Sequence, residues 1–533
     1  MSCLENAPRS AAGCAILVLV SSLAACGGGG GSSGGGNTGG PTGWVAGVFQ
    51  PSATFAAKCA SPRTGTDPAT QMPYPDVQGS TTTENNWLRS WTNELYLWYS
   101  EVPDQNPANF ATPDYFNLLK TSATTPSGAP KDKFHFTYNT AQWEALSQSG
   151  VQVGYGAQWA IIAAKPPRQV VVAYTEPGSN AVAAPANLAR GAEILAIDGL
   201  DLVNDNNSTD INTLNADLSP TTAGVSHSFT VQDLGASTTR TFTMASETVT
   251  SAPVQDVMTI STGTGTVGYM LFNDHLATAE QALIDAVNTL KAANISDLVL
   301  DIRYNGGGYL DIASEAAYMI AGAGPTAGRT FELTQFNDKH PTTDPVTGNA
   351  ITPVPFHTTT QGFSTTAGQA LPTLNLARVY VLTGPDTCSA SESIINSLRG
   401  VGVQVIQIGS TTCGKPYGFY PQDNCGTTYF SIEFRGVNDA GFGDYSDGFS
   451  PQNSTGTVGT TVPGCSVADD YTHALGDQNE GRLAAALGYR ANATCPSPPT
   501  GIAPPARATQ LAATDGKVIK APWLENRILR PMQ

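Results

Sequence analysis

The middle of the chain reads LVLDIRYNGGG at residues 298–308. The first five residues are almost all apolar, which is typical of a strand buried on both faces. Three glycines follow, and residues 313–321 have the composition of a helix. This order of strand, glycine turn and helix indicates an α/β arrangement. Glycines at such a turn let the backbone approach a ligand and expose N–H groups, and a plain tight turn is the alternative explanation.

Two similar joints follow. Residues 378–383 read as a strand that leads to Ser389-Ala390-Ser391-Glu392 at the start of a helix. Residues 401–408 read as the next strand, which leads to Thr412-Cys413-Gly414-Lys415. A serine at a helix N-terminus lies where free N–H groups favour negative charge, although helix capping explains a serine there equally well.

Other enzyme classes fit these joints less well. Residues 409–415 match a phosphate-binding loop, but Pro416 stands where that loop has its magnesium ligand, so we do not expect nucleotide binding. Penicillin-recognising enzymes need Ser-x-x-Lys, which does not occur in the chain. The six histidines are scattered without metal-ligand spacing, so we expect neither a metal nor a cofactor.

The three motifs together resemble peptidase family S41, the C-terminal processing or tail-specific peptidases. They are Asp301 to Gly308, Ser389 to Glu392 and Thr412 to Lys415. The resemblance covers about residues 145–489 and implies a crotonase-like α/β peptidase core. The catalytic set that it implies is the nucleophile Ser389, the general base Lys415, and an oxyanion hole of the Gly307 and Ala390 N–H groups, with the glycine register open by one residue.

The family also implies a third catalytic residue. Many relatives have a glutamine four residues after the lysine, and that position is Phe419 here. Glu392 is therefore the remaining candidate, and simple support of the helix is the alternative. A lysine must be neutral to take the proton of a serine hydroxyl. We expect burial to lower the pKa of Lys415 towards 7, at a cost of about 4–5 kcal/mol.

Three further expectations concern this site. His275 is the alternative base, and Ser391 is the alternative nucleophile. We expect extended substrate along a strand edge near residues 429–434.

Residues 146–250 read as β-rich and resemble a PDZ domain. The resemblance rests on the loop Gly154-Tyr155-Gly156-Ala157 and on the strand and turn at residues 190–199. In that family the loop N–H groups bind the terminal carboxylate of a peptide that adds to the sheet edge. Ala157 is small where a larger apolar residue is common, so a purely structural PDZ-like module is the alternative.

The first 26 residues resemble a bacterial lipoprotein signal. An apolar stretch at residues 11–20 precedes Leu23-Ala24-Ala25-Cys26, which implies that Cys26 carries a lipid. A secretory signal cleaved near Ala25 is the alternative, and both place the chain in the bacterial cell envelope. Residues 27–40 are almost entirely Gly, Ser and Asn, which predicts a flexible tether.

Length and charge complete the predicted organisation. The chain has 533 residues and a net charge of -17, which argues against a nucleic-acid partner. Trp87, Trp91, Leu95 and Trp98 recur at helical spacing, which predicts a buried helix. The expected parts are a signal (1–26), a tether and linker (27–80), a small N-terminal helical domain (81–145), the PDZ-like domain (146–250), the S41 core (251–490) and a Pro-rich tail (491–533).

Six cysteines follow the signal, and an even number in an oxidising compartment predicts disulfides. A contact between Ser389 and Lys415 brings their neighbours together, so we expect Cys388 to pair with Cys413. We also expect Cys425 with Cys465, and Cys59 with Cys495 by elimination.

The sequence thus predicts an exported, lipid-anchored serine endopeptidase that acts on polypeptides. The alternative is a catalytically silent peptide-binding lipoprotein of the same fold. The intact Ser389 and Lys415 argue against that alternative.

Overall fold

The computed structural model of the protein describes residues 44–68, 70–456, 459–498 and 527–528. The predicted signal, Cys26 and the tether lie outside these ranges. Within them, no helix is both long enough and apolar enough to cross a membrane.

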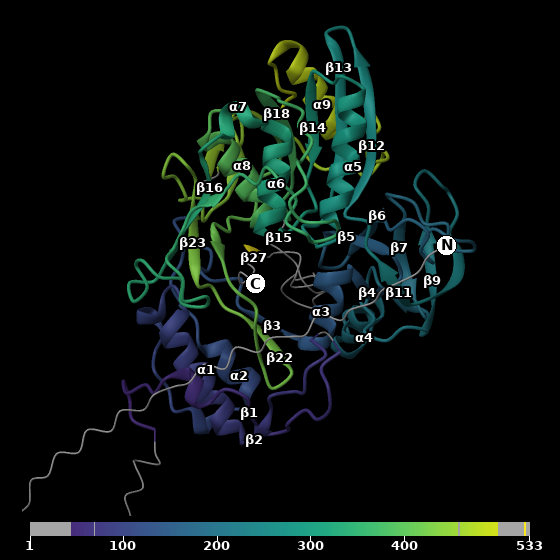
Figure 1. Ribbon diagram of the computed structural model, residues 1–533. Coiled ribbons are helices and arrows are strands. Elements are labelled where there is room, and N and C mark those ends of the chain that lie inside the picture. The colour runs from purple at the N-terminus through teal and green to yellow at the C-terminus, as the bar shows by residue number, and fades with distance from the viewer. Residues whose placement is uncertain (1–43, 69, 457–458, 499–526, 529–533) are drawn as a thin grey trace, which may run out of the picture. The chain divides into compact units, whose positions relative to one another are not determined.

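A six-stranded sheet in the order β12-β13-β14-β18-β19-β26 forms the centre of the fold (Figure 1). Its strands are β12 (Val254–Thr262), β13 (Gly265–Phe272), β14 (Asp297–Asp301), β18 (Arg378–Thr383), β19 (Gln404–Gly409) and β26 (Gly464–Ser466). β12 is antiparallel to β13, and the remaining neighbours are parallel. The carboxyl ends of β14, β18 and β19 therefore meet at one edge of the sheet.

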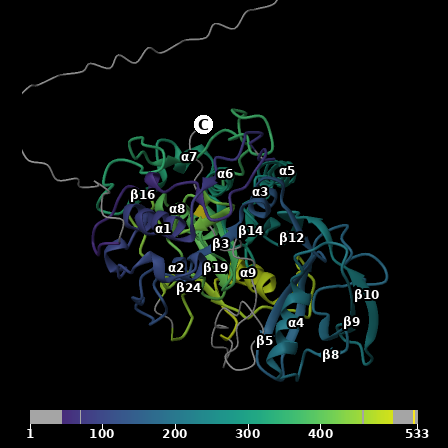
Figure 2. The same ribbon diagram turned by 90° about the horizontal axis from the view of Figure 1, so that it is seen from below.

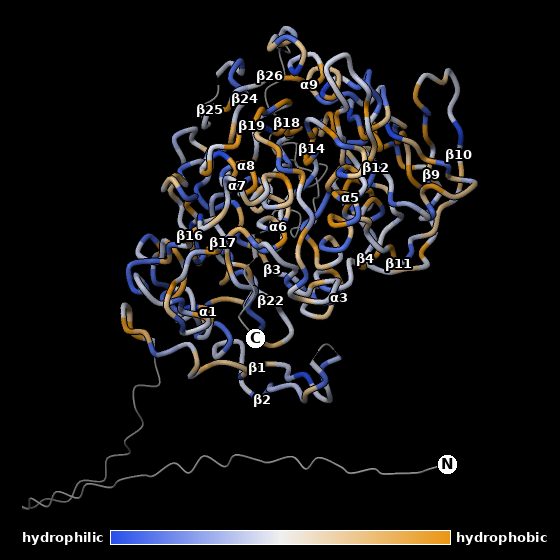
Figure 3. Tube along the Cα trace, turned by 45° about the horizontal axis from the view of Figure 1, so that its top comes forward, coloured by the Kyte–Doolittle hydropathy of each residue, from blue (hydrophilic) through white to orange (hydrophobic). Residues whose placement is uncertain are grey.

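Helices cover both faces of this sheet, which explains why its inner strands β14 and β18 are almost completely buried. The helices are α5 (Ala279–Ala292), α6 (Leu310–Ala321), the short α7 (Ala323–Thr326), α8 (Ala390–Gly400) and α9 (Gly481–Asn492). Leu298 and Leu300 of β14 share a buried cluster with α5, α6 and α8. Val299, between them, shares the opposite cluster with Leu483 of α9. Figure 3 shows the hydrophobic colouring of these strands.

The N-terminal region is helical, as predicted. It contains β1 (Lys58–Cys59), β2 (Val77–Gln78), α1 (Thr81–Leu95), α2 (Thr112–Leu118) and the 3-10 turns η1 (Ser52–Thr54), η2 (Tyr99–Glu101) and η3 (Pro107–Asn109). Trp87 and Trp91 of α1 stack with ring centroids 5.2 Å apart, and both are buried. Trp87 and Trp91 of the predicted stripe therefore form a core, whereas α1 ends at Leu95 and Trp98 lies beyond the helix and is half-buried.

The β-rich region forms a second six-stranded sheet. Its path is β10-β9-β7-β6-β5, with β8 paired to β7, so β5 is an end strand of that path. The elements are α3 (Thr140–Ser149), β4 (Val151–Gly154), β5 (Ala157–Ala163), β6 (Gln169–Thr175), β7 (Glu193–Ile197), β8 (Leu200–Asp201), α4 (Ser208–Leu218), β9 (Ser226–Gln232), β10 (Arg240–Ala245) and β11 (Glu247–Thr250). Figure 2 shows α4 beside β5.

Smaller sheets surround the candidate site. They consist of β3 (Phe136–Asn139) with β21 (Gln422–Asn424) and β22 (Thr427–Phe430); β16 (Thr330–Phe336) with β17 (Val354–Pro355), β20 (Tyr417–Gly418) and β23 (Phe434–Val437); β24 (Phe449–Pro451) with β25 (Thr460–Val462); and β15 (Gly308–Tyr309) with β27 (Arg527–Ile528). β22 lies between β21 and β3, and β23 lies between β16 and β20. The predicted substrate edge near residues 429–434 is therefore wrong, because both strands are paired on both sides.

Three disulfides join the described residues, and one of the three predicted pairs is confirmed. Cys388 pairs with Cys413, as expected. The predicted pairs Cys425–Cys465 and Cys59–Cys495 are wrong, because the bonds are Cys59–Cys425 and Cys465–Cys495.

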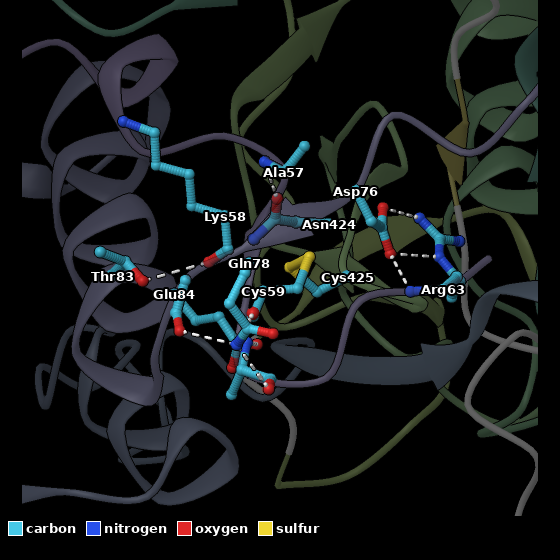
Figure 4. The surroundings of a disulfide bond; sticks show 12 residues. Ala57, Lys58, Cys59, Arg63, Asp76, Gln78, Thr83, Glu84, Asn424 and Cys425 are labelled. Carbon is cyan, nitrogen blue, oxygen red and sulfur yellow. Dashed lines mark hydrogen bonds and ion pairs between the residues drawn. A yellow bond between two sulfur atoms is a disulfide. The ribbon is translucent and has the colours of Figure 1, made fainter.

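Tertiary neighbours explain the two corrected pairs. Cys425 lies at the turn between β21 and β22, where Asn424 accepts a hydrogen bond from Ala57 N–H (Figure 4). Cys495 follows α9, which packs beside β26 and its Cys465. The spacing of the cysteines along the sequence does not predict either of these contacts.

Candidate active site

Three loops meet at the carboxyl edge of the central sheet, where open α/β sheets bind their ligands. They follow β14, β18 and β19, and each contains one of the three motifs of the sequence. Asn305 O accepts hydrogen bonds from Cys388 N–H and from Ser391 Oγ, both at 3.0 Å. Cys413 N–H donates to Thr387 O at 3.0 Å. The structure thus brings the three motifs together through their backbones.

Ser389 lies at the start of α8 in an unusual backbone conformation. Its φ is 58° and its ψ is -116°, a region that costs a non-glycine residue about 1–3 kcal/mol. The side chain is fully buried. Ala390 is the first residue of α8, so its N–H has no acceptor within the helix. The helix therefore presents a serine and a free helical N–H position at the same point.

The buried carboxylate of Glu392 connects the serine loop to the lysine loop. Its Oε2 accepts Ser389 N–H at 3.0 Å and Lys415 N–H at 2.8 Å. Its Oε1 accepts Gly414 N–H at 2.8 Å and the hydroxyl of Thr412. Four donors to one carboxylate are enough to stabilise its charge away from water. Glu392 thus fixes the backbones of Ser389 and Lys415 relative to each other.

Lys415 is fully buried, and aromatic rings surround its ammonium group. Its Nζ lies 4.7 Å from the ring centre of Phe134 and 4.7 Å from that of Phe419. Phe419 occupies the position where relatives often have glutamine, so a ring face stands there instead of an amide. The rings exclude water, and their faces attract a cation when the lysine is protonated.

The glycine loop is held by Asn305. Its Oδ1 accepts Gly307 N–H at 2.9 Å and lies 2.9 Å from His275 Nδ1. Burial lowers the pKa of His275 to about 3, so the imidazole is neutral. We assign the hydrogen to Nδ1, because Asn305 Oδ1 can only accept.

Two predictions change as a result. Gly307 N–H is used inside the loop, so the predicted oxyanion donor moves by the one residue that the sequence left open, to Gly308. His275, the alternative base, has its Nδ1 turned to Asn305 and holds the loop.

An ion network holds the same loop against α9. Arg303 contacts Asp301 at 2.8 Å and Glu480 at 2.7 Å, and all three side chains are fully buried. Asp469 also contacts Arg303, and the surrounding guanidinium groups hold the pKa of its carboxyl well below its usual range. The first residues of the Asp301 motif are therefore structural.

The predicted peptide-binding loop lies in a separate groove. Gly154, Tyr155, Gly156 and Ala157 line a cavity of 590 Å³ together with Leu218 of α4. Trp159 Nε1 donates to Leu218 O at 3.0 Å and so ties β5 to the end of α4. Neither Ser389 nor Lys415 lines this cavity.

Sequence reasoning missed two residues of the site. Phe134 comes from the N-terminal region, and no motif linked it to Lys415. Asn305 was part of the first motif but had no role. An asparagine directly before three glycines is a signal for it, because its side chain commonly accepts a hydrogen bond from a backbone N–H two residues on.

Comparisons with known proteins match two segments of the chain. Residues 266–418 match the description Peptidase family S41, and residues 83–136 match Peptidase S41 N-terminal domain. The chain contains peptidase S41 family domains.

Two similar proteins show how far the similarity in sequence and fold extends. A carboxyl-terminal-processing protease of Picosynechococcus sp. is 32% identical over 179 residues, which is 32% of this chain and 39% of the relative. A solved S41 protease structure from Bacteroides fragilis has a TM-score of 0.56 at 23% identity and covers 79% of this chain and 98% of its own. The second likeness concerns the fold alone. The chain spans well under half the length of the curated relative that it matches.

Proposed function

We propose that this chain is a serine endopeptidase that uses Ser389 and Lys415 to cleave polypeptides. The observation that carries the proposal is the Glu392 carboxylate, which accepts hydrogen bonds from the backbones of both residues. Such an arrangement fixes a nucleophile and a base relative to each other before substrate arrives. The S41 domains support the same reaction class.

The reaction begins when Lys415, in its neutral form, takes the hydroxyl proton of Ser389. Ser389 Oγ attacks the substrate carbonyl, and the N–H groups of Gly308 and Ala390 stabilise the oxyanion. The C–N bond breaks as the lysine returns the proton to the leaving amine. Water, activated by Lys415, then hydrolyses the acyl-enzyme and releases the second product.

The groove between β5 and α4 is proposed to bind the C-terminus of the substrate. β5 is an end strand of its sheet path, so a peptide has an edge to which it can add. The loop at residues 154–157 supplies the N–H groups for a carboxylate. Amidating the C-terminus of a substrate should therefore weaken its binding.

Export and lipid attachment at Cys26 complete the proposal and rest on the sequence of the first 26 residues. Labelling cells with a radioactive fatty acid tests this directly. The wild-type chain should incorporate label, and a Cys26→Ser variant should not. Equal labelling of both would contradict the anchor.

Ser389→Ala tests the proposed chemistry. The substitution removes the oxygen that attacks the substrate, so we expect kcat to fall by at least about 10³-fold. Cleavage of an unfolded polypeptide by the purified variant measures it. Ser391→Ala is the matched control, because it removes the neighbouring hydroxyl, and its kcat should fall by about tenfold at most. If Ser389→Ala cleaves at a wild-type rate, the nucleophile lies elsewhere.

A further inference from the structure

The last strand that the structure describes lies against the glycine loop of the candidate site. β27 pairs in parallel with β15, with Arg527 opposite Gly308 and Ile528 opposite Tyr309. β27 also contacts β20, the strand that begins two residues after Lys415. It therefore contacts both the loop after β14 and the segment after Lys415. Figure 1 shows β27 beside β15.

β27 uses a particular edge of β15. On the opposite edge, Tyr309 N–H donates to His275 O at 2.9 Å, and His275 N–H donates to Gly307 O at 3.1 Å. Successive peptide groups of an extended chain point to opposite sides. The N–H and C=O of Gly308 therefore point towards β27. This N–H is the one proposed for the oxyanion hole.

Gly308 packs closely against His275 on the edge opposite β27. Its φ is 139°, and a Cβ there would lie 2.4 Å from His275 O and 2.8 Å from His275 Cβ. Residue 308 must therefore be glycine for β15 to sit against His275. A strand on the other edge is then recognised through main-chain groups, which are the same in every polypeptide.

We propose that the edge of β15 binds an extended polypeptide in parallel orientation, and that β27 occupies this edge as an intramolecular inhibitor. The inference rests on the proposed peptidase function, because substrate and tail segment compete for one edge. Release of the segment would open the site.

The sequence of the tail suits this role. Residues 516–533 contain four basic side chains and one acidic side chain, whereas the whole chain has a net charge of -17. A basic segment is attracted to an acidic protein.

The expected size of the inhibition follows from tethering. A flexible tether gives a segment an effective concentration of about 1 mM. If the free segment binds with a Kd of about 0.1 mM, the tethered segment occupies the edge about nine-tenths of the time. Removing it should therefore raise kcat/KM for a polypeptide substrate about tenfold.

The first experiment compares cleavage by four forms of the protein. They are the full chain, a variant that lacks residues 499–533, the double variant Arg527→Pro with Ile528→Pro, and the control Val518→Pro with Ile519→Pro. Proline removes the backbone N–H that strand pairing needs. The deletion and the first proline pair should be about tenfold more active than the full chain, and the control within twofold of it. Equal activity of all four forms would overturn the inference.

The second experiment measures binding without turnover, in the Ser389→Ala background. The probe is a fluorescent peptide of residues 520–533 with both ends blocked, followed by anisotropy. We expect it to bind the tail-deleted form at least tenfold more tightly than the full chain, because the full chain holds its own segment. Equal affinity for the two forms would overturn the inference. This binding experiment tests the inference even if no form of the protein cleaves a substrate. The absence of cleavage in every form would instead contradict the proposed peptidase function.

Discussion

The carboxyl edge of the central sheet and the groove beside β5 are both candidate polypeptide sites, but they are built differently. At the sheet edge, the motif residues bond one another, since Glu392 accepts from both Ser389 and Lys415. At the groove, the loop at residues 154–157 forms one wall, and α4 forms another from a distant part of the chain. Hydrogen bonds between the motif residues therefore hold the site at the sheet edge in place. The groove depends instead on packing between β5 and α4. Substitutions should affect chemistry at the first and affinity at the second.

Glu392→Gln should have the largest effect of the substitutions that distinguish the two sites. Each oxygen of this carboxylate faces two donors, so an amide NH₂ would oppose donors in either orientation. We expect the free energy of unfolding to fall by about 2–4 kcal/mol. We also expect kcat to fall by at least about 10²-fold, because a small misplacement of nucleophile and base is costly. Chemical unfolding and cleavage kinetics measure the two effects, and unchanged values would contradict the bridging role.

Gly156→Ala should have a smaller effect, confined to affinity. Gly156 has a φ of 78°, and a Cβ there would lie 2.1 Å from Ser179 Cβ, so the loop must move. We expect KM for a substrate with a free C-terminus to rise about tenfold, with kcat within twofold, because only remote binding is lost. Gly199→Ala is the matched control: its φ is 83°, and a Cβ there would have no contact within 4 Å. Equal KM values for both variants would remove the groove from substrate binding.

The two sites also differ in how much of them the sequence predicted. The three motifs follow neighbouring parallel strands, so the α/β pattern predicted that they meet at one edge of the sheet. The same reasoning predicted the Cys388–Cys413 disulfide. Phe134 was not predictable, because its contact with Lys415 depends on how the N-terminal region packs. The role of β27 was not predictable either, because two residues of strand carry no periodicity. The contribution of α4 to the groove could not be predicted from the loop motif either, because α4 comes from a distant part of the chain.

Glu315→Gln should have the smallest effect on activity and provides a contrast to Glu392. Burial and the neighbouring Glu280 raise the pKa of Glu315 to about 9, so the folded protein holds a proton that the unfolded chain releases above about pH 4.5. The free energy of unfolding of the wild type should therefore fall as pH rises from about 4.5 to about 9.

Glutamine mimics the protonated carboxyl and does not titrate. Relative to wild type, the Glu315→Gln variant should gain up to about 2 kcal/mol between about pH 6 and pH 8. Its kcat should stay within twofold of wild type, since Glu315 does not contact the candidate catalytic residues. Urea unfolding at several pH values measures the gain, and parallel pH curves for the two proteins would refute the raised pKa of Glu315.

The most direct test of the proposed Ser–Lys mechanism is the comparison of Lys415→Arg with Lys415→Ala. A guanidinium keeps the positive charge but cannot take the serine proton at any working pH. If Lys415 is the base, both variants should lose about 10³-fold or more of kcat while still binding the blocked tail peptide, and wild-type kcat should rise with pH as the base loses its proton. A Lys415→Arg protein that keeps a tenth or more of the wild-type kcat would contradict the mechanism and show that the lysine acts as a cation.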